Sequence, residues 1–400
     1  MINIDLIAII IFYGLLILLF IKKREKFEVQ GKVFALYKTK LGLKLMDRIG
    51  NFSPRVMKWV GYVGVVVGFS GMSFIFYFLI KETFNFVTTP GAIPPLAPVL
   101  PGVAIPGAPV LSFWHWIIAI FIVAVVHEFS HGVMARTHGI KIKSSGFAFM
   151  GPILAAFVEP EEKEMVKKKK MAQLSVFAAG PFSNIILGFL FIALLVFVSG
   201  PLVGSMYQPG GTIVSAFVEG YPAVESGLEL PFTIKQINGE DTMEFVQFVN
   251  VITKINPDDE INLVTDQGEF DIIAGINPDN SSRGFMGIAG FQQKRIIKES
   301  LVNFEWLAKF MIWFNLLISW LFLINIGVGL FNLLPLGPVD GGRMFITAAT
   351  AIFKNERIAI KLFAIVSWIC LLLIFINLWP WVMRLITWLG KGFLFLLAVI

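Results

Sequence analysis

The residues LSFWHWIIAIFIVAVVHEFSH, from Leu111 to His131, form an almost purely apolar run that ends in two histidines and a glutamate. In an α-helix, His127 and His131 lie four residues apart on the same face, so both imidazoles can reach one metal ion. Glu128 stands beside them, where a carboxylate can take a proton from an attacking water. Ionisable groups at membrane depth are costly, so this cluster requires a functional explanation. The stretch predicts a zinc hydrolase site within a bilayer.

The composition is that of a membrane protein. Hydrophobic residues make up 56% of the 400 residues and charged residues only 15%, whereas a soluble globular protein has about 25% charged residues. The net charge of +6 comes from basic residues clustered beside apolar segments, which suits an anionic membrane surface and argues against nucleic acid as a partner. The single cysteine, Cys370, excludes an intrachain disulfide and a cysteine-rich zinc site.

The apolar segments predict a polytopic α-helical membrane protein with about six to seven spans, since about 20 apolar residues cross the hydrocarbon core. The candidate spans are Ile4–Ile21, Met57–Ile80, Phe113–Ala135, Met171–Val198, Phe310–Leu333, Ala359–Leu378 and Trp381–Ala398. The last two are separated only by Trp379 and Pro380, which predicts a tight hairpin or a kinked pair. The first is interpreted as a retained span because it lacks a preceding basic region and a small-residue cleavage site.

The distribution of lysine and arginine predicts the orientation of the spans. Basic residues fill the segments that follow the first, third and fifth spans, and such segments belong on the cytoplasmic side. The loops at 81–112 and 200–305 then face outward. We therefore expect a multi-pass protein of the cell membrane, in contact with the lipid bilayer.

Two further segments are predicted to be non-helical. Residues 88–109 are crowded with proline and glycine, which predicts an outer loop that covers the helices. Residues 146–154 are apolar, β-leaning and too short to span the bilayer. A non-helical segment at membrane depth is tolerated only when it is buried in protein or lines a cavity. This short β-like membrane segment is therefore expected to form a wall beside the metal site.

Residues 210–292 differ from the rest of the chain, because apolar and polar residues alternate there between turn signals. This pattern predicts strands, and residues 243–255 have helical spacing. The length suffices for one small α/β domain on the outer side. The predicted strands are 211–214, 233–237, 261–265 and 285–288.

A catalytic zinc site needs a third protein ligand, and the best candidate is Asp340. It follows a turn broken by proline and glycine in the stretch NLLPLGPVDGGR, from Asn332 to Arg343. From its spacing alone, Asp340 could equally cap a helix at 344–353. The topology favours the metal site, because two further crossings after the histidine span bring Asp340 to the same inner edge as His127 and His131.

The motifs of this chain resemble those of the site-2 protease family of intramembrane zinc metalloproteases. The resemblance covers most of residues 112–345, and the family usually has leucine where Val339 stands. The matching motifs are HEFSH at 127–131, AGPFSN at 179–184, NLLP at 332–335 and VDGG at 339–342.

The resemblance implies a role for each site residue. His127, His131 and Asp340 would bind Zn²⁺, and Glu128 would be the general acid/base. Asn184 would bond the substrate backbone or the developing oxyanion, unless it is only a helix-packing amide. The implied reaction is hydrolysis of a peptide bond within a transmembrane helix of a membrane-tethered substrate, as in regulated intramembrane proteolysis, near the cytoplasmic side.

The outward domain resembles the PDZ-like module that many of these proteases carry. The matching residues are GYPA at 220–223, SGL at 226–228 and IKQING at 234–239. Such a module could bind a peptide by strand addition, or it could exclude substrates with bulky ectodomains.

The predicted organisation has five parts. They are N-terminal spans at 1–110, a first catalytic part at 111–205, the PDZ-like domain at 206–292, a second catalytic part at 293–353 and C-terminal spans at 354–400.

Two rival functions use the same polar cluster. A transporter or metal-binding scaffold is disfavoured because no internal repeat is found. A surface zinc protease would be expected to have hydrophilic residues upstream of its histidines, unlike residues 111–126.

Overall fold

The computed structural model describes residues 4–22, 25, 27–30, 34–103, 105, 107–150 and 153–399. The chain divides into two compact units. Unit 1 comprises Met1–Leu195 and Leu316–Ile400, and unit 2 comprises Val196–Asn315. Unit 1 contains all the predicted catalytic and metal-binding residues, and unit 2 contains the predicted outward domain.

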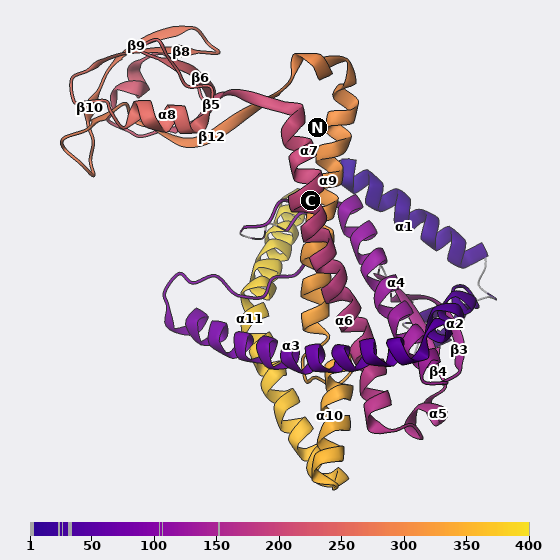
Figure 1. The fold of residues 1–400 in the computed structure, drawn as a ribbon. Helices are drawn as coiled ribbons and strands as arrows, with labels where there is room; N and C mark the ends of the chain where they lie inside the picture. Colours follow the sequence, from indigo (N-terminus) through magenta and orange to yellow (C-terminus); the bar gives the residue numbers. More distant parts are fainter. Residues whose placement is uncertain are drawn as a thin grey trace. The chain divides into compact units, whose positions relative to one another are not determined.

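Long apolar helices make up most of unit 1 (Figure 1). All the helices of this unit, including the short helices α2 and α5, are α1 (Ile4–Lys22), α2 (Leu43–Phe52), α3 (Pro54–Thr88), α4 (Phe113–Thr137), α5 (Glu162–Val166), α6 (Lys170–Leu194), the later part of α9 (Glu305–Phe331), α10 (Asp340–Phe353) and α11 (Glu356–Val399). Within the described residues, five helical segments are long and apolar enough to cross a membrane, and they contain α3, α4, α6, α9 and the part of α11 up to Thr387. The chain is therefore a helical integral membrane protein, as predicted.

The C-terminal apolar segments do not form the hairpin that was one of two predicted arrangements. Residues 359–378 and 381–398 belong to a single helix, α11, which has Pro380 inside it. A proline inside a helix removes one backbone hydrogen bond. The long apolar sequence on both sides nevertheless continues as helix, so only the bonding around Pro380 is interrupted.

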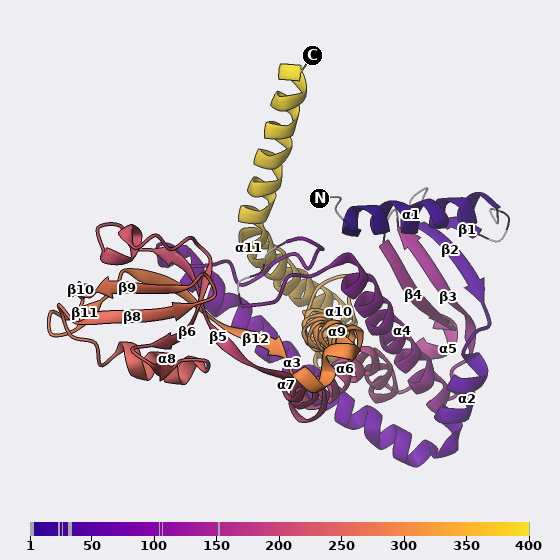
Figure 2. The ribbon, with the colours of Figure 1, turned by 90° about the horizontal axis from the view of Figure 1, so that it is seen from above.

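A four-stranded antiparallel sheet of unit 1 has the order β1-β2-β3-β4. Its strands are β1 (Phe27–Gln30), β2 (Phe34–Thr39), β3 (Ile142–Met150) and β4 (Ile153–Pro160). Of the β-leaning segment predicted at 146–154, residues 146–150 lie in β3 and residues 153–154 lie in β4, which confirms the extended conformation of these parts, and Gly151 and Pro152 lie outside the described residues. Strand β4 forms the edge of the sheet and packs along α4 (Figure 2). Strands β1 and β2 were not predicted, because they lie in the basic segment after α1.

Glycines allow α3 to approach the helices that carry the site. A Cβ atom at Gly64 would lie 3.3 Å from the ring of Phe182 in α6, and one at Gly68 would lie 2.7 Å from the Met344 side chain in α10. A larger residue at either position would require the Phe182 ring or the Met344 side chain to shift, since packed cores have little free space. Helix α3 therefore helps to fix the positions of α6 and α10.

Two tryptophans bind the segment rich in proline and glycine. The Trp116 indole donates to the carbonyl of Val99, and the Trp381 indole donates to the carbonyl of Leu96, each at 2.9 Å. The described residues between α3 and α4 contain no helix, in agreement with the prediction. The segment is thus attached to α4 and α11.

Unit 2 contains a sheet with the strand order β12-β5-β6-β8-β9, in which β7 also pairs with β6. The helices and strands of unit 2 are α7 (Gly200–Met206), β5 (Tyr207–Phe217), β6 (Phe232–Ile237), β7 (Glu240–Asp241), α8 (Phe245–Ile252), β8 (Glu260–Thr265), β9 (Glu269–Ile273), β10 (Gly275–Ile276), β11 (Gly284–Phe285) and β12 (Ile288–Ile297). The fully buried side chains of Ile234, Phe248 and Leu263 join the sheet to α8. The strands predicted at 211–214, 233–237 and 261–265 lie within β5, β6 and β8. The single strand predicted at 285–288 is wrong, because β11 ends at Phe285 and β12 begins at Ile288.

Candidate metal centre

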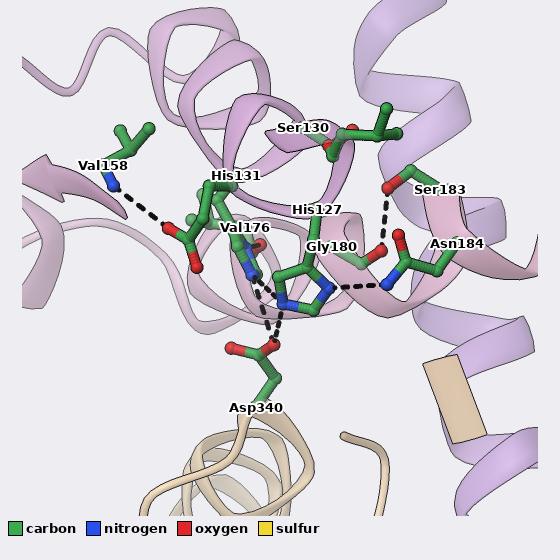
Figure 3. A network of polar contacts seen from close by, with 11 residues as sticks. His127, Ser130, His131, Val158, Val176, Gly180, Ser183, Asn184 and Asp340 are labelled. Carbon is green, nitrogen blue, oxygen red and sulfur yellow. Dashed lines mark hydrogen bonds and ion pairs between the residues drawn. The ribbon is translucent and has the colours of Figure 1, made fainter. Parts of the chain in front are cut away.

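Three ligand atoms from α4 and α10 converge in unit 1 (Figure 3). Asp340 Oδ2 lies 3.0 Å from His127 Nε2 and 3.2 Å from His131 Nε2, and the two imidazole nitrogens are 3.1 Å apart. Both histidines are more than nine-tenths buried. Asp340 and His131 are 209 positions apart in sequence, so the fold creates the site by packing both α4 and α10 against α6.

This triangle fits the ligand set of a zinc ion. Zinc binds histidine nitrogens and carboxylate oxygens at about 2.0–2.2 Å in a tetrahedral arrangement, which places neighbouring ligand atoms about 3.3 Å apart. The three separations in the structure are close to this value. Imidazole and carboxylate are also the ligand types of catalytic zinc sites, so the residues present suit the ion in chemistry and in spacing.

Gly180 leaves the space that an ion would need. This residue of α6 faces the two histidines, and a Cβ atom added to it would lie 2.4 Å from His131 Nε2 and 2.7 Å from His127 Nε2. Any larger residue would therefore occupy the space next to the ligand nitrogens. The glycine of the AGPFSN motif is required by this close approach of α6 to α4.

The Nδ1 atom of His131 is bonded to the backbone of α6. It lies 2.7 Å from the carbonyl oxygen of Val176. A carbonyl can only accept, so His131 Nδ1 carries the proton and Nε2 keeps its lone pair. The Val176 carbonyl thus holds the ring in the tautomer that a metal ligand needs.

Asn184 occupies the corresponding position at His127. Its side-chain nitrogen lies 3.0 Å from His127 Nδ1, its exposed fraction is 0%, and its Oδ1 has no hydrogen-bond partner among the described residues. Because the nitrogen and oxygen of a side-chain amide can exchange places, Asn184 can present a donor or an acceptor to His127. With the oxygen toward the ring, Nδ1 donates and Nε2 is free to bind a metal.

Asp340 is the first residue of α10, and the capping position belongs to Val339. The carboxylate of Asp340 contacts His127 and His131. Of the two predicted roles for this aspartate, the geometry supports that of a ligand.

The two glycines after Asp340 let α10 begin directly against the preceding turn. A Cβ atom would lie 2.2 Å from the carbonyl oxygen of Leu333 if placed on Gly341, and 2.1 Å from that of Leu336 if placed on Gly342. Neither position can hold a side chain without moving the backbone. The DGG sequence therefore places the carboxylate where the turn and the helix meet.

Glu128 extends from α4 toward β4. Its Oε2 accepts a hydrogen bond of 3.0 Å from the backbone nitrogen of Val158, and a carboxylate oxygen lies within 4.8 Å of the ligand nitrogens of both histidines. A cavity of about 260 Å³ adjoins this group, and a cavity of that size with polar walls can hold water. It is lined by His127, Glu128, His131, Val158, Pro160, Met165, Val176, Phe177, Asn332, Pro338, Val339, Asp340 and Arg343.

The structure brings all five predicted site residues into one cluster, and it adds groups that were not predicted. These are the backbone N–H of Val158, the backbone carbonyl of Val176 and the space beside Gly180. A backbone group has no signature in a side-chain pattern. For Gly180 a signal existed, since the glycine belongs to the motif that also contains Asn184.

Comparisons with known proteins identify the family of the chain. A family model described as peptidase family M50 matches residues 115–374, which include every residue of the cluster. The uncharacterized protein MJ0971 of Methanocaldococcus jannaschii is 28% identical over 354 residues, which cover 84% of this chain and 82% of that protein. With a family match over more than half of its length, and with helices able to cross a membrane, the chain belongs to peptidase family M50, the site-2 protease family, whose members are membrane-embedded metalloproteases.

Proposed function

We propose that the chain is a zinc-dependent protease that hydrolyses peptide bonds within transmembrane segments of membrane-tethered substrates. The observation that carries this proposal is the triangle of His127 Nε2, His131 Nε2 and Asp340 Oδ2 on helices of a membrane protein. Family membership supports the class of reaction.

In this proposal each residue of the cluster has a stated task. His127, His131 and Asp340 hold the ion, which when bound supplies a Lewis acid that polarises the scissile carbonyl and acidifies water. Glu128 takes a proton from the attacking water and returns it to the leaving amine. A contact of Asn184 with the substrate backbone or the oxyanion stays a prediction. The contact of Asn184 with His127 supports a different role, in which Asn184 orients this ligand.

The substrate must be extended at the cleaved bond, because a helix engages its own carbonyls in hydrogen bonds. We propose that it pairs with the free edge of β4. Two observations support this choice: β4 pairs only with β3 within the described residues, and Val158 and Pro160 of β4 line the cavity beside the metal ligands. Water that reaches Glu128 through this cavity would be the second reactant of the hydrolysis.

Further parts of the proposal concern the surroundings of the site. The basic segments after the first, third and fifth predicted spans support an active site near the cytoplasmic face of the cell membrane. We propose that unit 2 is a PDZ-like module, which either binds a peptide or excludes bulky ectodomains. A titration of the full chain with a peptide, in which the NMR signals of unit 2 are followed, separates these two tasks. Only peptide binding predicts chemical-shift changes that saturate.

Cleavage in reconstituted membranes tests the proposed function. The purified chain is placed in liposomes with a panel of single-pass transmembrane polypeptides, and products are mapped by mass spectrometry. We expect cleavage within an apolar segment, loss of cleavage with a chelator and recovery with Zn²⁺. Glu128→Gln should bind zinc and cleave nothing.

The other outcomes identify the rival functions. Cleavage by Glu128→Gln would remove this residue from the mechanism. Solute transport without cleavage would favour a transporter, and zinc binding without either would favour a scaffold. Cleavage confined to soluble proteins would favour a surface protease.

A further inference from the structure

Glu128 is fixed by a backbone group of the neighbouring sheet. Its Oε2 lies 3.0 Å from the Val158 nitrogen, and in the part of the chain that the structure describes this is the one hydrogen bond of the carboxylate. The partner cannot change rotamer, because it belongs to the backbone of β4. One carboxylate oxygen is therefore held on the β4 side and the other is left for chemistry.

The Val158 N–H is available for this bond because of its position in the sheet. Val158 lies opposite Ser145 in β3, and Ala156 lies opposite Phe147, with no irregularity between these pairs. In an antiparallel pair, alternate residues direct their N–H and C=O groups away from the partner strand. Since Val158 donates outward to Glu128, Ala156 also directs its N–H to the free edge.

The bond matters because Glu128 stands within reach of the metal position. A carboxylate oxygen of Glu128 lies within 4.8 Å of the ligand nitrogens of His127 and His131. A carboxylate this close could itself bind the ion as a fourth protein ligand. A catalytic zinc site, in contrast, keeps the fourth position open.

We propose that the backbone N–H of Val158 is a positioning group for Glu128, which keeps the carboxylate out of the coordination sphere and directs its free oxygen to the attacking water. This inference rests on the proposed function. It also limits how a substrate can pair with β4, since the Val158 N–H is already used. The substrate backbone then pairs with earlier residues of the edge, such as Ala156.

Proline substitutions test the inference, because proline lacks the N–H. Val158→Pro removes the bond to Glu128 and no ladder bond, whereas Val158→Ala keeps the N–H and removes only the side chain. Ala156→Pro is the matched control, since it removes another outward N–H of the same edge. Each variant is prepared as the full chain, with Co²⁺ in place of Zn²⁺ for visible absorption spectra and with Zn²⁺ for cleavage kinetics.

The expected results separate the two N–H groups. Val158→Pro should lower kcat about 10- to 100-fold, the usual effect of losing a group that orients a metal site, and should shift the Co²⁺ spectrum as Glu128 becomes a ligand. Adding Glu128→Gln to Val158→Pro should abolish that shift. Ala156→Pro should raise KM and leave the spectrum unchanged, and Val158→Ala, which keeps the N–H, should also leave the spectrum unchanged.

Other results would overturn the inference. One such result is that Val158→Pro has the same kcat and the same Co²⁺ spectrum as Val158→Ala. Another is that the spectral shift of Val158→Pro persists when Glu128→Gln is added. Failure of the proposed function is a different result, because the wild-type protein would then cleave nothing.

A second measurement leaves β4 unaltered and covers the case in which Val158→Pro does not fold. Amide hydrogen exchange at Val158 should be at least about tenfold faster in Glu128→Ala than in the wild type, since an unbonded amide loses its protection. The amide of Phe157, which faces β3, should be unchanged. Equal exchange of Val158 in both proteins would show that Glu128 does not hold this bond.

Discussion

His127 Nδ1 lies 3.0 Å from the side-chain nitrogen of Asn184, which is fully buried in α6. The same helix supplies the Val176 carbonyl that bonds His131 Nδ1 at 2.7 Å. Helix α6 therefore orients both imidazoles of α4 without supplying a ligand. Metal-binding histidines usually have such a partner on the second nitrogen, and the partner sets the tautomer.

Replacement of Asn184 is predicted to weaken zinc binding. Asn184→Leu should lower the affinity about 10- to 100-fold, because His127 loses the group that can accept from Nδ1. Asn184→Asp should retain the affinity, since a carboxylate accepts from Nδ1 and favours the tautomer with Nε2 free. Competition with a chromogenic chelator measures both values.

The control for this pair is Asn325→Leu, which removes another fully buried asparagine, one that bonds the carbonyl of Leu321. It should leave the zinc affinity unchanged. An Asn184→Leu variant with normal zinc affinity but no cleavage would instead support the predicted contact with the oxyanion.

The three candidate metal ligands could be identified from the sequence because their chemistry resides in side chains. His127 and His131 have helical spacing within an apolar run, and Asp340 follows a broken turn at the same predicted depth. Each requires a function to offset the cost of burial. The structure confirms that all three meet.

The groups that hold the site residues in position could not be predicted in the same way. Val158 and Val176 act through backbone atoms, and any apolar residue would give the same pattern. Strands β1 and β2 lie in a segment whose lysines indicated a cytoplasmic loop, and the long-range pairing of β2 with β3 leaves no local signal. The C-terminal helix α11 continues through Pro380, where local preference predicts an interruption.

Gly180→Ala is predicted to abolish zinc binding. The added Cβ would lie 2.4 Å from His131 Nε2, so the ring or α6 must move. Alanine is also the better helix former by about 1 kcal/mol, so the loss would not come from a weaker helix. Equilibrium dialysis with Zn²⁺ measures the result.

Gly327→Ala is the control for Gly180→Ala, because a Cβ at Gly327 in α9 has nothing within 4 Å. It should bind zinc normally. A Gly180→Ala protein that also binds zinc at full stoichiometry would show that the space beside the histidines is not needed.

Asp340→Asn is predicted to reduce zinc affinity by at least about tenfold and to remove cleavage, because a neutral amide replaces the anionic ligand. The variant keeps the size of the side chain, so α10 should remain folded. Asp47→Asn is the control, since Asp47 forms a partly exposed ion pair with Arg136 at 2.8 Å. An equal loss of affinity in both variants would mean that the effect comes from net charge and not from coordination.

The stability of the protein is predicted to fall in mild acid because of His138. This residue follows α4, and its Nε2 lies 2.7 Å from the hydroxyl of Ser175. Burial lowers the pKa of His138 from 6.5 to about 4, and the cations of Lys58 and Lys168 act in the same direction. The unfolded chain therefore binds the proton more readily than the folded chain between these two values. The contribution of His138 is complete above pH 6.5 and is lost as the pH falls toward 4.

Thermal unfolding in detergent at pH 7.5 and at pH 5 checks this prediction, with His138→Gln as the comparison. The glutamine side chain can donate to the Ser175 hydroxyl and does not titrate, so the Tm of this variant should fall less between the two pH values than that of the wild type. An identical fall of Tm in the wild type and His138→Gln would show that other groups cause the acid sensitivity.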